Sequence, residues 1–236
     1  MTYNCVTLKA LGAMNKLTEL FREAKQIFTT HGLVALVRQG FSFVIPPQLF
    51  EYGTYYLYED ATENITRLNE ADFMPKIDNF TLKIVSTNHE ADELEAKGLE
   101  FRSHDRIYRD RLDKGAIAFC IFVGRDLAHV GWVAMNEQAQ KAVLRLPLQI
   151  KFSNDEAFSG GSRTNRRYRG NGLHVYSTFK LTEYLCDKGR VVNRGAVQTS
   201  SIVSQKTFAK FGHRIYAEAR YLKILWWKSW KEKLLP

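Results

Sequence analysis

The chain has 236 residues, and its 34 lysines and arginines outnumber its 25 aspartates and glutamates, which gives a formal net charge of +9. A composition that is 45% hydrophobic and 13% aromatic supports a buried core, which excludes a globally disordered chain. The longest apolar stretch, within 33–45, is interrupted by polar residues and is shorter than the roughly 20 residues that cross a bilayer. No secretory signal is apparent, and three widely spaced cysteines suggest neither a disulfide framework nor a zinc site. We therefore expect a cytoplasmic protein.

The first third of the chain reads as a helical extension. Apolar residues recur at helical spacing over 16–31, and a shorter apolar helix follows until two prolines stop it. The aromatic run Thr54–Tyr58 suits a strand or an extended arm. We therefore expect a helical N-terminal extension over 1–75 and a second domain over 76–236.

Strand-like and helix-like segments alternate from residue 80 onward. In chain order, the sequence predicts a strand at 80–86, helices at 89–96 and 103–113, strands at 116–123 and 127–135, extended segments at 146–152 and 157–164, a helix from a glycine-containing turn at 169–172 to Cys186, a strand at 196–199, a helix at 202–211 and a strand at 220–226. This order favours an α+β fold with a central βαβ unit.

The segment 163–174 carries the strongest chemical signal. Gly170 and Gly172 allow a tight turn between a strand and a helix, where unpaired N–H groups and the helix dipole favour an anion. Four arginines within seven residues supply charge-assisted hydrogen bonds that suit a phosphate better than a carboxylate. The alternative is an ordinary connection with solvated arginines, and the order of the flanking elements argues against it.

At this segment the chain resembles the GNAT superfamily of acyl-CoA-dependent N-acetyltransferases. Arg167-Tyr168-Arg169-Gly170-Asn171-Gly172 matches the family's Gln/Arg-x-x-Gly-x-Gly/Ala motif, and the resemblance spans about 78–226. It implies a mixed, mostly antiparallel central sheet flanked by helices, and acetyl-CoA as the acyl donor, with no metal. It also implies a set of CoA-binding residues, in which backbone amides of the motif hold the pyrophosphate and the preceding strand pairs with the pantetheine: Thr164, Asn165, Arg167, Tyr168, Arg169, Gly170, Asn171, Gly172, Leu173, Ser201 and Phe208.

A second family pattern is poorer and leaves the catalytic acid open. Many members place Asn at the start of the next helix and Tyr seven residues later, where this chain has Ser201 and Phe208. The tyrosine would protonate the departing thiolate, and phenylalanine lacks a proton to give. Ser201, Ser204, Tyr216 and solvent are the candidates for the acid, of which we choose Ser204.

The catalytic base is also open. The attacking amine must be neutral, so a base or desolvation has to remove a proton. Glu156 precedes the strand that leads to the motif, where family members often carry an acidic base, and a solvated turn is its alternative. His129 lies within a predicted strand, with a structural role in the sheet as its alternative. His174 suits either the cofactor phosphates or a helix face.

The predicted function is transfer of an acetyl group from CoA to an amine of a small molecule. One alternative is a domain of the same fold that binds CoA without turnover. The other is a basic module for nucleic acid or a membrane surface, which the net charge and the Trp–Lys run 226–235 support. For this run we favour packing within the chain or against a second subunit, which leaves a homodimer open, over membrane contact. We expect no nucleic-acid partner, because CoA phosphates already account for the arginines.

Overall fold

The computed structural model describes residues 50–235, and the helices predicted within 1–49 lie outside this range. The chain divides into two compact units. The larger unit comprises Thr54–Arg220 and Trp230–Pro236, and it contains all the residues of the site described below. The described residues of the smaller unit are Phe50–Gly53 and Tyr221–Ser229.

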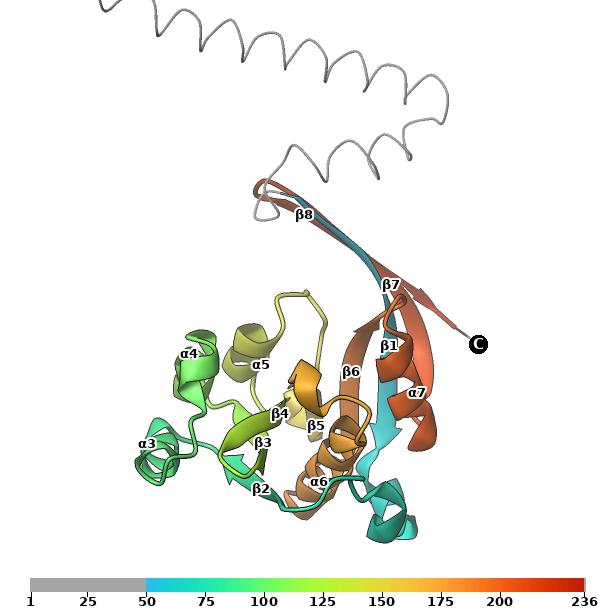
Figure 1. Cartoon of the computed structure of the whole chain (residues 1–236). Helices are drawn as coiled ribbons and strands as arrows, with labels where there is room; N and C mark the ends of the chain where they lie inside the picture. The colour runs from blue at the N-terminus through green and yellow to red at the C-terminus, as the bar shows by residue number, and fades with distance from the viewer. Residues whose placement is uncertain (1–49, 236) are drawn as a thin grey trace, which may run out of the picture. The chain divides into compact units, whose positions relative to one another are not determined.

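One mixed sheet of eight strands runs in the spatial order β2-β3-β4-β5-β6-β1-β7-β8 (Figure 1). The strands are β1 (Phe50–Ala61), β2 (Phe80–Val85), β3 (Ile117–Val123), β4 (Asp126–Ala134), β5 (Glu156–Thr164), β6 (Val192–Gln198), β7 (Arg214–Ile224) and β8 (Trp227–Leu234). The pairs β1–β6, β2–β3, β3–β4 and β4–β5 are antiparallel, whereas β5–β6 is parallel. The prediction of an α+β fold with a mixed, mostly antiparallel sheet is confirmed.

Helices cover both faces of this sheet. Within the described range the α-helices are α3 (Asn88–Ala96), α4 (Ile107–Asp113), α5 (Glu137–Val143), α6 (Leu173–Asp187) and α7 (Ile202–Lys210). Along β4, the ring of His129 lies 5.4 Å from His174 of α6, whereas Trp132 lies 5.2 Å from Tyr108 of α4. Because residues an odd number apart on a strand point to opposite faces, α6 and α4 lie on opposite sides. None of the helices in this range has the length and apolar composition needed to span a bilayer.

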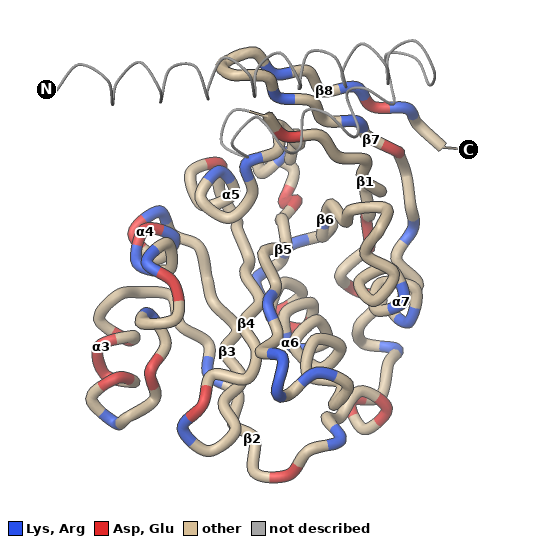
Figure 2. The backbone as a smooth tube through the Cα atoms, turned by 45° about the horizontal axis from the view of Figure 1, so that its top comes forward, with Lys and Arg blue, Asp and Glu red and all other residues tan. Residues whose placement is uncertain are grey.

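Charge is distributed unevenly over these elements. Figure 2 shows basic residues on the connection between β5 and α6 and along β7 and β8, and acidic residues around α3. The acidic helix α3 starts with a capping box formed by Thr87 and Glu90. The basic connection contains the glycine motif, so positive charge gathers where the sequence predicts an anion site.

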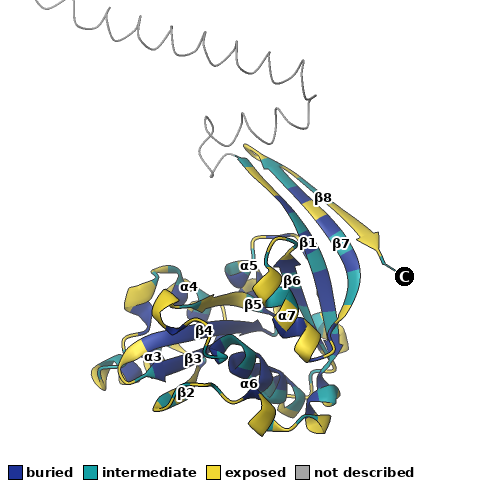
Figure 3. Cartoon of the chain, turned by 45° about the vertical axis from the view of Figure 1, so that its right-hand side comes forward, coloured by how far each residue is buried: buried dark blue, intermediate teal, exposed yellow. Residues whose placement is uncertain are grey.

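The centre of the sheet is buried on both faces (Figure 3). Nearly every residue of β3 and β4 is buried, and Phe119, Phe122 and Trp132 are fully so. A continuous apolar strand is what burial on both faces requires, so the predicted strands 116–123 and 127–135 follow directly from composition. This rigid centre supports β5, the strand that leads into the motif.

Strands β5 and β6 separate after a short parallel pairing. Only Glu156–Phe158 of β5 pair with Val192–Arg194 of β6. Farther along β5, Gly161 adopts a φ of +60° where the register against β4 shifts, which marks a bulge. The C-terminal half of β5 therefore no longer pairs with β6, and on that side it has no strand partner among residues 50–235.

Strand β1 is a central strand and corrects the predicted domain organisation. It pairs with β6 from Tyr55↔Gln198 to Ala61↔Val192 and lies between β6 and β7. The strand expected at Thr54–Tyr58 is confirmed within β1, which belongs to the sheet and not to a helical extension; the helical extension over residues 1–49 and the boundary at 75/76 stay predictions. The partners of β1 lie more than half the chain away, so no local pattern could reveal this pairing.

Two other segments differ from the sequence prediction. The extended segment predicted at 146–152 is not a strand, because Leu146 and Leu148 are buried and the Leu148 carbonyl accepts a hydrogen bond from Gln140 of α5 at 2.6 Å. The Trp–Lys run 226–235 contains the regular strand β8, which lies beside β7 in the sheet. In both segments the conformation is set by contacts with the preceding element of the chain.

Candidate functional site

The connection between β5 and α6 is a preformed turn that leaves a helix N-terminus open. The Asn165 side chain accepts a hydrogen bond from the Arg167 N–H at 3.1 Å and starts a 3₁₀ helix over Arg166–Tyr168. Gly170 and Gly172 follow with φ of +85° and +78°, values that other residues adopt only with strain. Gly172 is the N-cap of α6 and provides no side-chain acceptor, so the first N–H groups of this 15-residue helix stay available for an anion.

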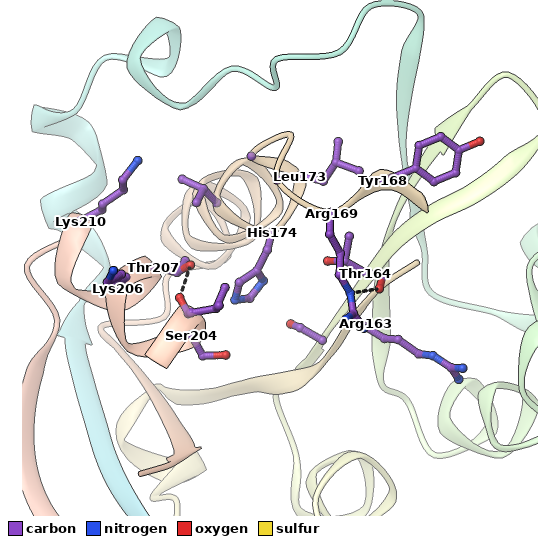
Figure 4. Close-up of a pocket in the computed structure, with 15 residues that line it drawn as sticks. Arg163, Thr164, Tyr168, Arg169, Leu173, His174, Ser204, Lys206, Thr207 and Lys210 are labelled. Carbon is purple, nitrogen blue, oxygen red and sulfur yellow. Dashed lines mark hydrogen bonds between the residues drawn. The ribbon is translucent and has the colours of Figure 1, made fainter. Parts of the chain in front are cut away.

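A cavity of about 680 Å³ opens in front of this helix end (Figure 4). Three elements line it: the end of β5, the glycine turn with the first residues of α6, and one side of α7. The lining residues are Ser162, Arg163, Thr164, Tyr168, Arg169, Gly170, Gly172, Leu173, His174, Val175, Val203, Ser204, Lys206, Thr207 and Lys210. We call this space the α6–α7 cavity.

The electrostatic environment of the α6–α7 cavity favours an anionic ligand. Lys206 and Lys210 of α7 line it opposite Arg163 and Arg169, and no aspartate or glutamate is among the lining residues. Arg163 has one distant carboxylate partner, Asp105, at 3.9 Å. Four basic side chains and the open N-terminus of α6 around one cavity suit a phosphorylated ligand.

Comparisons with known proteins match the fold at low sequence identity. No protein-family model matches the sequence, and no curated protein does. The GCN5-related N-acetyltransferase-like protein from Streptococcus suis superposes with a TM-score of 0.50 and 14% identity, over 83% of this chain and 68% of that one. This chain has the GNAT fold.

Two further solved structures match with lower TM-scores. The GNAT-family acetyltransferase from Colwellia psychrerythraea has a TM-score of 0.47 and 14% identity, and the tandem GNAT protein from the clavulanic acid biosynthesis pathway has 0.47 and 15%. The matches cover 75% and 76% of this chain but 57% and 54% of those proteins. The chain therefore spans little more than half the length of these GNAT proteins.

Six of the residues predicted from the GNAT resemblance to bind CoA line the α6–α7 cavity. They are Thr164, Tyr168, Arg169, Gly170, Gly172 and Leu173. Three other predicted residues shape the turn instead: Asn165 caps the 3₁₀ helix, Arg167 pairs with Asp126 at 3.3 Å, and Asn171 donates to the Tyr168 carbonyl at 3.2 Å. The motif thus contains both cavity-lining residues and residues that hold the turn in place.

The two residues predicted on the later GNAT helix lie behind the cavity wall. Phe208 is buried and stacks on Tyr58 of β1 with ring centroids 4.8 Å apart. The Ser201 hydroxyl lies 3.0 Å from the hydroxyl of Ser204, which does line the cavity. Of the predicted acids, Ser204 is the hydroxyl that the structure places at the cavity.

His129 lies beneath the cavity beside His174. Its Nδ1 is 2.8 Å from the Thr164 hydroxyl, and its Nε2 is buried without a hydrogen-bond partner among the described residues. Burial lowers the pKa of His129 well below its usual value, with a further contribution from His174. Burial also lowers the pKa of His174 to about 4. Both imidazoles are therefore neutral near pH 7, and His174 is the one that lines the cavity.

Glu156 lies at the closed end of the β5–β6 pair and is not among the cavity-lining residues. Its carboxylate accepts hydrogen bonds from Arg194 at 2.9 and 3.0 Å and from the Lys151 N–H at 2.9 Å. Burial raises the pKa of Glu156, but these bonds outweigh it, so its pKa is lowered overall. A carboxylate held in this way is a weak base.

Sequence reasoning named Ser204 of α7 but not the other residues with which this helix lines the cavity. Val203, Lys206, Thr207 and Lys210 follow one another at intervals of three, one and three residues, which places them on one face of the helix. That spacing is visible in the sequence. Which face of the helix looks toward the motif depends on the separation of β5 and β6, which the sequence does not show.

Proposed function

We propose that this protein transfers an acetyl group from acetyl-CoA to an amine of a small molecule. The observation that carries the proposal is the open N-terminus of α6, formed by Gly170 and Gly172, facing a cavity with four basic residues and no acidic one. A ligand with a pyrophosphate and a 3′-phosphate matches that charge. The GNAT fold supports the choice of acetyl-CoA, because members of this superfamily use it.

The residues have distinct roles in this proposal. The N–H groups of the glycine turn bind the pyrophosphate, and Lys206 and Lys210 bind the remaining phosphate. The C-terminal half of β5, which no longer pairs with β6, offers its backbone N–H and C=O groups to the pantetheine amides. The pantetheine then pairs with β5 in the way an added strand does.

The reaction is a direct displacement at the thioester. The amine nitrogen bonds to the acetyl carbon, the C–S bond breaks, and the thiolate takes a proton from Ser204 or from solvent through it. Once the C–N bond has formed, the nitrogen holds its proton far less tightly than a free amine does, so the proton passes to the neutral imidazole of His174 at the cavity and from there to solvent. We assign Glu156 to holding the closed end of β5 and β6 together with Arg194.

A second candidate function is CoA binding without turnover. The buried Phe208 supports it, because no hydroxyl is present at the position of the usual GNAT acid. Release of free thiol from acetyl-CoA in the presence of a panel of primary amines separates the two functions. Binding without thiol release favours the second.

The first experiment is thermal unfolding of the full chain with acetyl-CoA and, separately, with adenosine 3′,5′-bisphosphate. A ligand at about 100 times its dissociation constant stabilises the folded state by about 2.7 kcal/mol, which is a clear rise in melting temperature. We expect that rise with acetyl-CoA and a smaller one with the bisphosphate. No shift with millimolar acetyl-CoA would contradict the proposal and favour a basic surface module.

A pair of glycine variants locates the site. Gly170→Asp places a carboxylate in the anion site and is expected to abolish the acetyl-CoA shift. Gly189→Asp is the matched control, because Gly189 also has a positive φ of 71° and open space around its Cα, but it is not among the cavity residues. Both variants bear the same backbone strain, so equal acetyl-CoA shifts in the two would refute the assignment of the turn.

A further inference from the structure

The turn between β7 and β8 exposes four consecutive apolar residues. Ile224, Leu225, Trp226 and Trp227 are 38%, 43%, 86% and 53% exposed, and we call them the β7–β8 tip. Single exposed apolar side chains are normal on a protein surface. Four adjacent ones at the end of a hairpin form a contiguous patch, which is typical of an interaction site.

The local geometry of the β7–β8 tip does not favour these residues. β7 ends at Ile224 and β8 begins at Trp227, so the turn has two residues, and Leu225 has a φ of 56°. Glycine is the residue that takes a positive φ at the first position of such a turn without strain. A leucine at this position followed by an exposed tryptophan reduces stability, so packing among residues 50–235 does not account for them.

Positive charge surrounds the β7–β8 tip, as Figure 2 shows along β7 and β8. The range 214–234 contains two acidic residues, Glu218 and Glu232. Its basic residues are Arg214, Arg220, Lys223, Lys228, Lys231 and Lys233. The hairpin therefore carries a clear excess of positive charge, with Lys223 and Lys228 directly beside the tip.

We propose that the β7–β8 tip docks on the surface of a bilayer that contains anionic phospholipid. Tryptophan prefers the headgroup region, where its apolar ring and its N–H group are both accommodated, and lysines beside it face the anionic headgroups. A protein partner fits less well, because a stable protein interface buries about 800 Å² on each side, more than four residues at a turn provide. Trp226 and Trp227 enter the headgroup region.

The test is sedimentation of the full chain with vesicles of phosphatidylcholine mixed with phosphatidylserine, and with vesicles of phosphatidylcholine alone. We expect binding to the mixed vesicles, a blue shift of tryptophan emission, and weaker binding at high salt. The double variant W226S/W227S is expected to lose binding about tenfold or more, because it removes the apolar area that enters the bilayer. Leu234→Ser is the matched control: Leu234 is 74% exposed and lies at the other end of β8.

The outcomes separate this proposal from the enzymatic one. W226S/W227S is expected to show the same rise in melting temperature with acetyl-CoA as the wild type. If the wild type shows no such rise, an unchanged melting temperature of the variant shows that it folds. Equal vesicle binding by wild type and W226S/W227S, or no binding of the wild type to the mixed vesicles, overturns the proposal. A third outcome also overturns the proposal: without lipid, the wild type is a dimer and W226S/W227S is a monomer. That result assigns the β7–β8 tip to a contact between two copies of the chain.

Discussion

Phe208 occupies the position where the GNAT resemblance places an acidic hydroxyl, and it has a structural role. Its ring stacks on Tyr58 and packs with Val197 in a buried cluster, so it joins β1, β6 and α7. One turn earlier on α7, Ser204 lines the cavity. A serine at that point supplies a proton donor to the cavity while the phenylalanine fills the core.

Removal of the Ser204 hydroxyl tests this division of roles. We expect Ser204→Ala to lower the rate of thiol release by about 10²-fold at saturating substrate, the usual contribution of a general acid, while the acetyl-CoA melting shift stays unchanged. Ser204→Thr keeps the hydroxyl and is expected to restore much of the rate. A Ser204→Ala enzyme as fast as wild type would assign the proton to solvent.

The glycine turn between β5 and α6 could be predicted from the sequence, because it lies in one short segment with a definite order of residues. The sequence left His174 open between the cofactor site and a helix face, and it did not predict Lys206 and Lys210 as cations that line the cavity. Their positions depend on how α6 and α7 are placed around the edge of β5, which results from a bulge and a short parallel pairing.

At the level of elements, an ion-pair network fixes the point where β5 and β6 separate. Arg194 of β6 bonds Glu156 of β5 at 2.9 Å and Glu59 of β1 at 2.7 Å, and its guanidinium lies over the Tyr216 ring at 4.8 Å. These groups join β5, β6, β1 and β7 at one level of the sheet. Because Glu156 is buried, loss of the arginine leaves this carboxylate without a cation in the interior, whereas Glu59 keeps Arg214.

Replacement of Arg194 should therefore destabilise the folded protein. We expect Arg194→Met to lower the free energy of unfolding by about 3–5 kcal/mol, measured by urea denaturation. Arg214→Met is the comparison, because Arg214 also pairs with Glu59 but its side chain is 67% exposed, and its loss should cost about 1 kcal/mol or less. Equal losses in the two variants would show that burial does not set the strength of this network.

Local patterns predicted the elements that are stabilised locally. The hairpin of β3 and β4 and helix α6 follow from apolar runs and from glycines at their ends. Of β1, the sequence predicted the strand at Thr54–Tyr58 but not its place between β6 and β7, because those partners lie far away in the chain. The sequence analysis also missed α5, although Asn136 caps it, and β8, which lies beside the preceding strand β7 after a two-residue turn. Sequence patterns thus identified the centre of the sheet, whereas the spatial order of its strands depends on distant contacts.

At the scale of the whole molecule, three histidines within residues 50–235 couple stability to pH. Burial lowers the pKa of His129 well below its usual value, and desolvation lowers the pKa of the buried His213 and of the partly buried His174 to about 4. His213 lies 3.4 Å from Asp60, whose pKa burial raises. The unfolded chain takes up protons on all three histidines near pH 6.5, and the folded chain does so only at lower pH.

Stability should therefore fall on acidification. Between about pH 6.5 and pH 4 the unfolded state binds more protons, and each histidine reduces the free energy of unfolding by about 1.4 kcal/mol per pH unit. Above this window the three contributions are fully present. Urea denaturation at several pH values measures the slope of the free energy of unfolding against pH. His213→Gln should reduce this slope by the contribution of one proton, about 1.4 kcal/mol per pH unit. A free energy of unfolding that stays constant from pH 7 to pH 5 would show that these histidines are not neutral by burial.

The position of β1 in the sheet affects how the molecule is made. Its neighbours, β6 and β7, are the sixth and seventh strands in the chain, so a ribosome has released β1 long before either neighbour exists. Until then its tyrosine-rich edges have no strand to pair with and are prone to associate with other unpaired strands. The sheet closes around β1 only after β6 and β7 have been synthesised, and contacts between such distant parts of a chain form slowly. The production of this protein should therefore depend more on the time before β1 is covered than on the stability of the finished fold.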